Sequence, residues 1–176
     1  MNIVSNKNLN DFFVPTGNRS PKGVYFLRLI GWDDEGALME FLVKYHAQTQ
    51  KNGLYIPRAL RNPDEGQVQE FYRRVGSNID FSPQGANRAV RGLFPGLSAD
   101  CADHLTEGVS DVISRLQAGG MNENMLKNAY IKLMCWLFLH CSDLAYLLEG
   151  AVAPKVLYEG EISKYEVYFL RLLSVA

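Results

Sequence analysis

Arginines are the residues whose type and spacing most directly suggest chemistry in this chain. Six of them occur between positions 58 and 91: Arg58, Arg61, Arg73, Arg74, Arg88 and Arg91. A guanidinium group donates two hydrogen bonds in one plane and therefore matches a phosphate. Tyr55, Phe71 and Tyr72 could stack on a base beside them. The segment predicts a phosphate, nucleotide or RNA surface. The alternative is a set of solvated helix faces whose arginines pair with nearby carboxylates such as Glu70.

A second candidate phosphate site is the turn that contains Gly160 and leads to Ser163. Residues 155–159 are predicted to form a strand, and Ser163 can cap the helix that follows. In open α/β sheets, ligands bind where a strand ends and a helix begins, because backbone N–H groups point outward there. Glu159 and Glu161 flank the turn, however, and their charge disfavours an anion. The alternative is a structural strand-to-helix turn without a ligand.

Cysteines, histidines and carboxylates show no pattern typical of a catalytic or metal site. Cys101 with His104, or Cys141 with His46, could be drawn as a nucleophile and its base, but no nucleophile-elbow, Walker or dinucleotide-binding motif accompanies them. Zinc sites usually need four ligands at spacings such as Cys-x2-Cys, which the chain lacks. An acidic stripe is expected to be solvated; it consists of Asp100, Asp103, Glu107 and Asp111. We therefore expect no metal site and assign neither a catalytic residue nor a cofactor.

Composition is typical of a globular protein. The chain has 176 residues, of which 47% are hydrophobic and 21% charged, too apolar for a disordered protein. The 18 Lys and Arg nearly balance the 19 Asp and Glu, which excludes a strongly basic nucleic-acid-binding tail but not a local basic patch. The longest uncharged apolar stretch, residues 133–142, is far shorter than the ~20 residues that cross a bilayer. With no visible signal peptide and three cysteines in no framework spacing, we expect free thiols in a cytoplasmic protein without a membrane partner.

Hydrophobic periodicity predicts a mainly α-helical fold with a few short β-strands. We expect a loose N-terminal arm over residues 1–21, a mostly helical domain over 22–150, and the start of a truncated α/β domain over 151–176. Caps and breakers predict a strand at 24–30, an extended piece at 54–56, and helices over 34–50, 63–75, 83–95, 98–118 and from 122 to between 140 and 148. The last of these is the most apolar and should be central to the core.

The C-terminal segment is predicted to be a strand, a glycine turn and a helix, the first two-thirds of a βαβ unit. A parallel strand needs a partner, and none follows the helix. We therefore expect the chain to be a fragment of a longer protein, cut where a sheet begins. Residues 155–159 would then pair with another segment, such as Val24–Ile30, or stay at an edge. The alternative is a C-terminal helix packed on the bundle.

The same segment resembles a known family. The shared pattern is Pro, a strand ending Tyr-x-Gly, then Ile, a spaced Glu and Phe-Leu-x-x-Leu; it is filled by Pro154, Tyr158, Gly160, Ile162, Glu166, Phe169, Leu170 and Leu173. This is similar to a passage in the YceG-like family of Bacillus and its relatives, described as a component of a biosynthetic module. A weaker similarity covers residues 132–137, and the first 100 residues add only Phe12–Val14 and the 24–31 segment.

The resemblance implies a bacterial cytoplasmic protein linked to tellurite-resistance and stress-response gene clusters. Those clusters encode enzymes of nucleotide-like or sugar-like metabolite synthesis, so the implied partners are proteins of the same cluster and a nucleotide-like ligand. The resemblance transfers no catalytic residue, and it places most of the chemistry outside this chain. Two other functions are left open: a helical protein-interaction scaffold anchored by Phe12 and Phe13, and a nucleic-acid-binding domain that uses the arginines.

Overall fold

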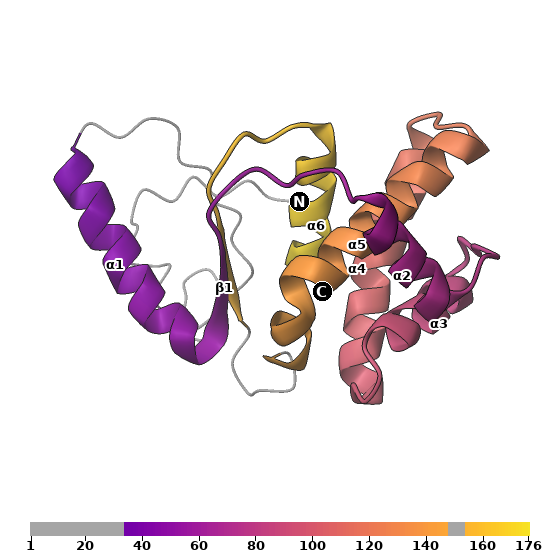
Figure 1. The fold of residues 1–176 in the computed structure, drawn as a ribbon, viewed down its shortest axis with the longest axis horizontal. Helices are drawn as coiled ribbons and strands as arrows, with labels where there is room; N and C mark the ends of the chain where they lie inside the picture. Colours follow the sequence, from indigo (N-terminus) through magenta and orange to yellow (C-terminus); the bar gives the residue numbers. More distant parts are fainter. Residues whose placement is uncertain (1–33, 148–153) are drawn as a thin grey trace.

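The computed structural model describes residues 34–147 and 154–176, which form six helices and two strands (Figure 1). In chain order these are α1 (Glu35–Asn52), β1 (Gly53–Ile56), α2 (Glu65–Val75), α3 (Pro83–Leu93), α4 (Ala99–Ala118), α5 (Glu123–Leu147), β2 (Lys155–Tyr158) and α6 (Lys164–Val175). The prediction of a mainly α-helical fold with a few short strands is confirmed. The predicted arm over 1–21, with Phe12 and Phe13, and the predicted strand over 24–30 lie outside the described residues.

Four of the helices begin at capping side chains, and α2 begins two residues later than the predicted start at residue 63, because Asp64 rather than Asn62 is the cap. The Asp34 carboxylate accepts two backbone N–H groups at the start of α1. At α2, Asp64 and Gln67 form a reciprocal capping box, with both hydrogen bonds 2.9 Å long. Ser82 and Ser98 each accept the backbone N–H three residues further along, at the starts of α3 and α4. Local chemistry therefore fixes where these four helices start.

Helix α5 is central to the hydrophobic core, as predicted from its composition. Met134, Trp136 and Leu137 are fully buried. The Trp136 ring meets Phe169 of α6 edge to face, and its Nε1 donates a hydrogen bond to the carbonyl of Arg61 at 2.7 Å. The helix kinks at Cys141, whose backbone is not helical. Across residues 34–147 and 154–176, neither α5 nor any other helix is long and apolar enough to span a membrane.

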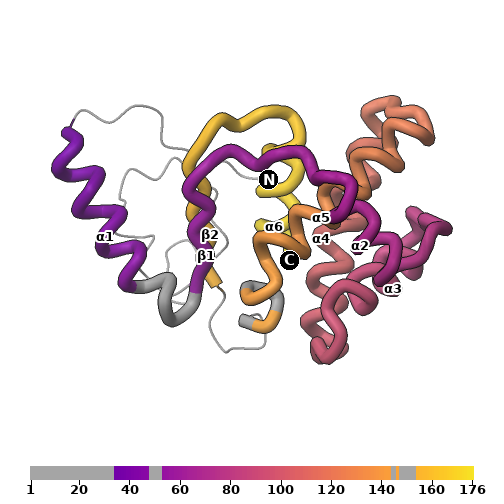
Figure 2. The backbone as a smooth tube through the Cα atoms, viewed as in Figure 1, coloured from indigo at the N-terminus to yellow at the C-terminus, as the bar shows by residue number. Residues whose placement is uncertain are grey.

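Strands β1 and β2 pair in parallel, with Gly53 opposite Lys155 and Ile56 opposite Tyr158 (Figure 2). The sequence suggested residues 24–30 as the partner of β2, or an edge position; the described partner is β1 instead. A parallel pair requires a long crossover, and here the crossover contains α2 to α5. The partner strand therefore lies between α1 and α2, and not after α6 as a βαβ unit beginning at β2 would require. The single proton of the Tyr45 hydroxyl is shared between the carbonyl oxygens of Leu54 in β1, 2.7 Å away, and Lys155 in β2, 3.0 Å away, which reinforces the pair.

Helix α6 packs closely along α4. A Cβ atom at Gly108 would lie 2.6 Å from the carbonyl oxygen of Leu172, so the two helices can approach this closely only at a glycine. Phe169 and Leu172 join the same core cluster as α5, and Arg171 of α6 lies 3.1 Å from Asp111 of α4. This packing agrees with the alternative of a C-terminal helix on the bundle. That residues 151–176 begin an α/β domain stays a prediction.

Candidate functional site

Two of the predicted arginines meet on one carboxylate at the end of α2. Arg73 and Arg74 each place a guanidinium nitrogen 2.6 Å from Oε1 of Glu70, because residues three and four apart share a helix face. Hydrogen bonds from the two arginines lower the pKa of Glu70 to about 2. Arg74 also lies over the Phe138 ring of α5, 4.5 Å from its centroid. Both guanidinium groups are therefore engaged by neighbouring side chains.

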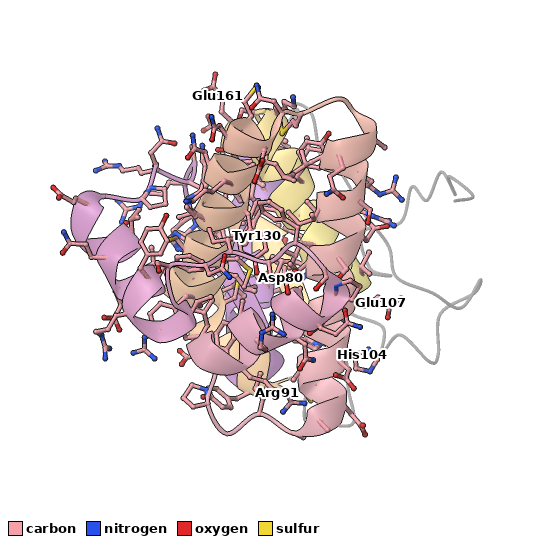
Figure 3. All side chains as sticks on the ribbon, turned by 90° about the vertical axis from the view of Figure 1, so that its right-hand side faces the viewer. Asp80, Arg91, His104, Glu107, Tyr130 and Glu161 are labelled. Carbon is pink, nitrogen blue, oxygen red and sulfur yellow. The ribbon has the colours of Figure 1, made fainter. Side chains whose placement is uncertain are left out.

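The α3 arginines bind different partners. Arg88 contacts Asp80 at 2.6 Å, and Arg91 donates to the side chain of Asn87 at 2.9 Å. Hydrogen bonds from Ser82 and Arg88 lower the pKa of Asp80. Figure 3 shows Arg91 at the opposite end of the molecule from Glu161, the residue after Gly160. Arg91 and the glycine turn therefore do not face a common ligand.

The Gly160 turn packs against the connection between β1 and α2. Gly160 has a φ of +151°, and a Cβ there would lie 2.6 Å from the backbone nitrogen of Ala59. The structure thus brings Gly160 next to the backbone of Arg58. Arg61 lies further along the same connection, where its carbonyl accepts the Trp136 hydrogen bond. The glycine is required by this close approach of two backbones.

Ser163, the remaining predicted phosphate ligand, forms a hydrogen bond with a carboxylate. Its hydroxyl donates to the carboxylate of Glu166, and its side chain makes no cap hydrogen bond to α6. Glu159 at the same turn accepts a hydrogen bond from the Tyr55 hydroxyl, and burial, together with this contact, raises the pKa of Tyr55 to about 12. Carboxylates therefore surround the N-terminus of α6, an arrangement that disfavours an anion there. The phosphate site at this turn stays a prediction.

Sequence reasoning did not predict the buried carboxylate beside Ser163 or the half-buried Lys132 of α5. Glu166 is the buried charged residue in the described part of the chain, with 5% of its surface exposed. Lys132 of α5 places its Nζ 4.7 Å from the ring centroid of Trp136 and 4.4 Å from that of Tyr165. Burial lowers the pKa of Lys132, and the charge of Glu166 opposes this shift. The sequence could have indicated the burial of Glu166, because Glu166 shares a helix face with the apolar Phe169 and Leu170 at spacings of three and four.

The cysteines and histidines do not assemble into a reactive site. All three cysteines are free and buried, whereas His104 is exposed although it lies three residues from Cys101. Burial, with a smaller effect of the Asp64 charge, raises the pKa of Cys135 to about 11, so its thiol stays protonated at neutral pH. In the chain as described, with residues 1–33 and 148–153 excluded, no three His, Cys, Asp or Glu side chains are grouped to hold a metal.

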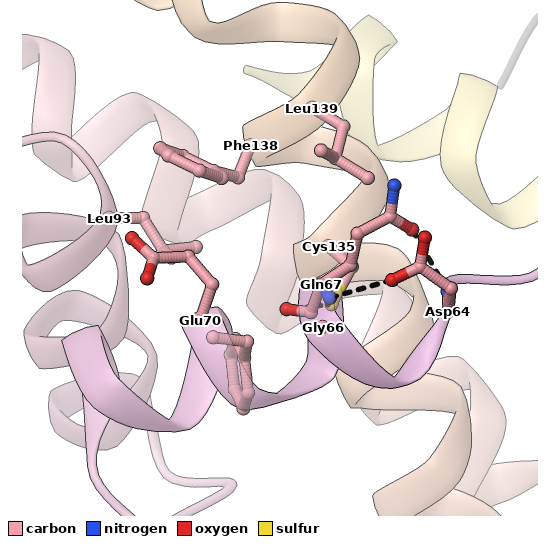
Figure 4. A pocket seen from close by; sticks show the side chains of 9 residues that line it. Asp64, Gly66, Gln67, Glu70, Leu93, Cys135, Phe138 and Leu139 are labelled. Carbon is pink, nitrogen blue, oxygen red and sulfur yellow. Dashed lines mark hydrogen bonds between the residues drawn. The ribbon is translucent and has the colours of Figure 1, made fainter.

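The structure does contain a pocket that the sequence did not indicate. It has a volume of about 240 Å³ and lies between α2 and α5, with one wall from α3 (Figure 4). Its lining is mainly apolar and comprises Gly66, Phe71, Leu93, Cys135, Phe138 and Leu139, together with the polar residues Asp64, Gln67 and Glu70. No sequence motif marks it, because the lining comes from three helices far apart in the chain.

Comparison with known proteins supplies no relative. No protein-family model matches the chain, and neither a curated protein nor a solved structure matches it. The assignment of function therefore depends on the geometry described above and on the resemblance of residues 154–173.

Proposed function

We propose that this chain is the helical support and interaction module of a stress-response protein. The resemblance to the YceG-like family suggests a tellurite-resistance-associated biosynthetic module that makes a nucleotide-like or sugar-like metabolite. The proposal is supported chiefly by one observation: the described residues of the shared pattern make structural contacts around β2 and α6. Gly160 and Phe169 pack against the rest of the molecule, and Tyr158 and Glu166 make local contacts around the turn between β2 and α6, as expected of residues that maintain a shared structural unit.

The contacts of these residues are structural. The Tyr158 hydroxyl donates to the carbonyl of Glu161 at 2.7 Å and so closes the turn. Gly160 lies against Ala59, where a side chain has no room. Phe169 is fully buried against Trp136, and Glu166 is buried beneath Ser163. A pattern composed of such residues supports a common scaffold more than a common reaction.

The chemistry of the proposed module belongs mainly to other segments or to partner proteins encoded in the same cluster. The ion pairs of this chain support the placement of the chemistry elsewhere. Glu70 binds two arginines, Asp80 binds Arg88, and Asp111 binds both Arg115 and Arg171. Side chains engaged in this way stabilise helices and helix contacts.

Co-purification and a thermal-shift screen together test the proposal. We expect the chain to form a stable complex with a protein encoded beside its gene, and to show no stabilisation by nucleotides, sugar nucleotides or phosphate. A ligand at ~100 times its dissociation constant would add ~2.7 kcal/mol to the free energy of unfolding, a readable shift. A nucleotide or sugar nucleotide that stabilises the chain would place a ligand site here. The absence of both a complex and a ligand would contradict the proposal.

A phosphate- or nucleic-acid-binding surface is the second candidate function. It is favoured by the exposure of two arginine side chains, 68% for Arg73 and 69% for Arg88, despite their ion pairs. Binding of single-stranded RNA that weakens as salt rises would support it, because phosphate contacts release counterions. The double charge reversal Arg73→Glu and Arg74→Glu should then abolish binding. Unchanged affinity in that variant would remove these residues from the surface.

A further inference from the structure

The pocket between α2 and α5 has an apolar interior suited to a hydrocarbon group. Phe71, Leu93 and Phe138 contribute side chains from three helices, and the buried thiol of Cys135 donates a weak hydrogen bond to the carbonyl of Gln67, 3.8 Å away. Leu139 forms part of the rim and is 41% exposed. A volume of about 240 Å³ accommodates roughly a single aromatic ring or short alkyl chain, which is below the usual range for drug-sized ligands.

The charged groups that line this pocket are both carboxylates. Glu70 is already saturated, because Arg73 and Arg74 bind its two oxygens. Asp64 is different. Its Oδ1 accepts the N–H of Gln67 in the capping box, and among the described residues its Oδ2 accepts no hydrogen bond.

The charge of Asp64 acts on Cys135, another residue of the pocket lining. This negative charge contributes to the raised pKa of Cys135, after the larger effect of burial. The carboxylate also faces the N-terminal end of α2, whose partial positive charge offsets part of its attraction for a cation. Asp64 nevertheless remains the single lining charge without a counter-charge, at the edge of an apolar cavity.

We propose that this pocket binds a small amphipathic amine, with its hydrocarbon part between Phe71 and Phe138 and its ammonium group on Asp64. An ammonium at the rim can donate to Asp64 Oδ2 while it remains partly hydrated. The buried hydrocarbon contributes most of the affinity, and the charge pair contributes selectivity over neutral and anionic molecules of the same shape. This site lies on the face formed by α2, α3 and α5, and it is independent of the proposed module function.

The experiment is an NMR titration of the labelled protein with three probes of similar shape. These are 2-phenylethylamine, 2-phenylethanol and 3-phenylpropanoate, which carry a positive, zero and negative charge. With nine non-hydrogen atoms, the amine should bind with a dissociation constant on the order of 1 mM. We expect the amine to bind about threefold more tightly than the alcohol, with the carboxylate weakest. The amide signals that move should belong to residues 64–71 and 135–139.

Two variants test the role of the rim. Asp64→Asn keeps a good helix cap and removes the charge, so the amine and the alcohol should then bind equally. Leu139→Lys places a competing ammonium at the rim and should weaken the amine at least threefold. Met125→Lys is the matched control, because Met125 is a similarly exposed residue of α5 outside the pocket lining, and amine binding should not change.

Several outcomes would overturn the proposal. Equal binding of the amine and the alcohol by the unmodified protein would remove Asp64 from the site. Tighter binding of the carboxylate would show that the pocket prefers a negative charge and not a positive one. Signals that move elsewhere, or no binding of any probe at 10 mM (roughly ten times the expected dissociation constant), would show that the pocket is not a ligand site. None of these results depends on whether the chain forms the complex expected of a support module.

Discussion

The helical core and the strand side of this molecule are held together in different ways. Helices α2 to α6 share one cluster of buried side chains, of which Trp136 is the largest that is fully buried. Helix α1 stands on the other side of β1 from that cluster (Figure 1) and presents Met39 and Val43, which are 59% and 63% exposed. Tyr45 connects α1 to both strands. The strands pack along the edge of the core, where Ile56 of β1 belongs to the buried cluster, and the Tyr45 hydroxyl adds hydrogen bonding that joins α1 to the strand pair.

The largest effect should follow from truncating the largest fully buried side chain, Trp136. Trp136→Ala is expected to lower the free energy of unfolding by about 3–5 kcal/mol, because it leaves a cavity and an unpaired carbonyl at Arg61. Urea denaturation followed by circular dichroism measures the loss. Leu139→Ala, at a 41% exposed position of the same helix, should cost much less. Equal losses for the two variants would show that α5 does not organise the core.

A smaller and more local effect is expected on the strand side. Tyr45→Phe removes the hydroxyl that bonds the carbonyls of Leu54 and Lys155, at an expected cost of about 1–2 kcal/mol. Hydrogen exchange should become faster at residues 53–56 and 155–158, while the amides of α5 keep their protection. Tyr146→Phe, which loses one hydrogen bond from an exposed hydroxyl, serves as the control. Uniformly faster exchange across the chain would mean that the two regions unfold together.

Loss of a helix cap should destabilise the core side alone by about 1 kcal/mol. Asp64→Ala removes one half of the capping box of α2, whereas Asp64→Asn keeps an acceptor at the same place and should remain within a few tenths of a kcal/mol of the unmodified protein. Thermal unfolding of the two variants in parallel makes the comparison. If the alanine variant unfolds at the same temperature as the asparagine variant, tertiary packing alone determines the start of α2.

The smallest effect concerns pH. Hydrogen bonds from Arg115 and Arg171 lower the pKa of Asp111, which joins α4 to α6. Because the folded pKa is depressed, this contribution is complete above the unfolded pKa of about 4 and disappears as the pH falls through the folded value. Asp111→Asn should therefore cost less than about 1 kcal/mol at pH 7 and nothing at low pH. Denaturation at a series of pH values checks this, with exposed Asp143→Asn expected to show no such dependence.

Local chemistry explains why the helices could be predicted and the sites could not. Ser82 and Ser98 mark the starts of α3 and α4 in the sequence, because a cap acts over only three residues. The parallel pairing of β1 with β2 depends on residues about 100 positions apart. The pocket likewise combines Leu93 with Phe138, and no local pattern relates such residues. The arginines could be found by type, but their separation over the β1–α2 connection, α2 and α3 follows from the tertiary fold.

The long crossover between the strands has a consequence for the order of folding. Helices α2 to α5 can assemble from contacts between neighbours in the chain, whereas β1 meets β2 only after a loop of about 100 residues has closed. We therefore expect the strand pair to form late, after the core has brought its ends together. A chain still being synthesised would hold β1 without its partner until Lys155–Tyr158 had left the ribosome, and during that interval its unpaired edge would be open to pairing with other chains.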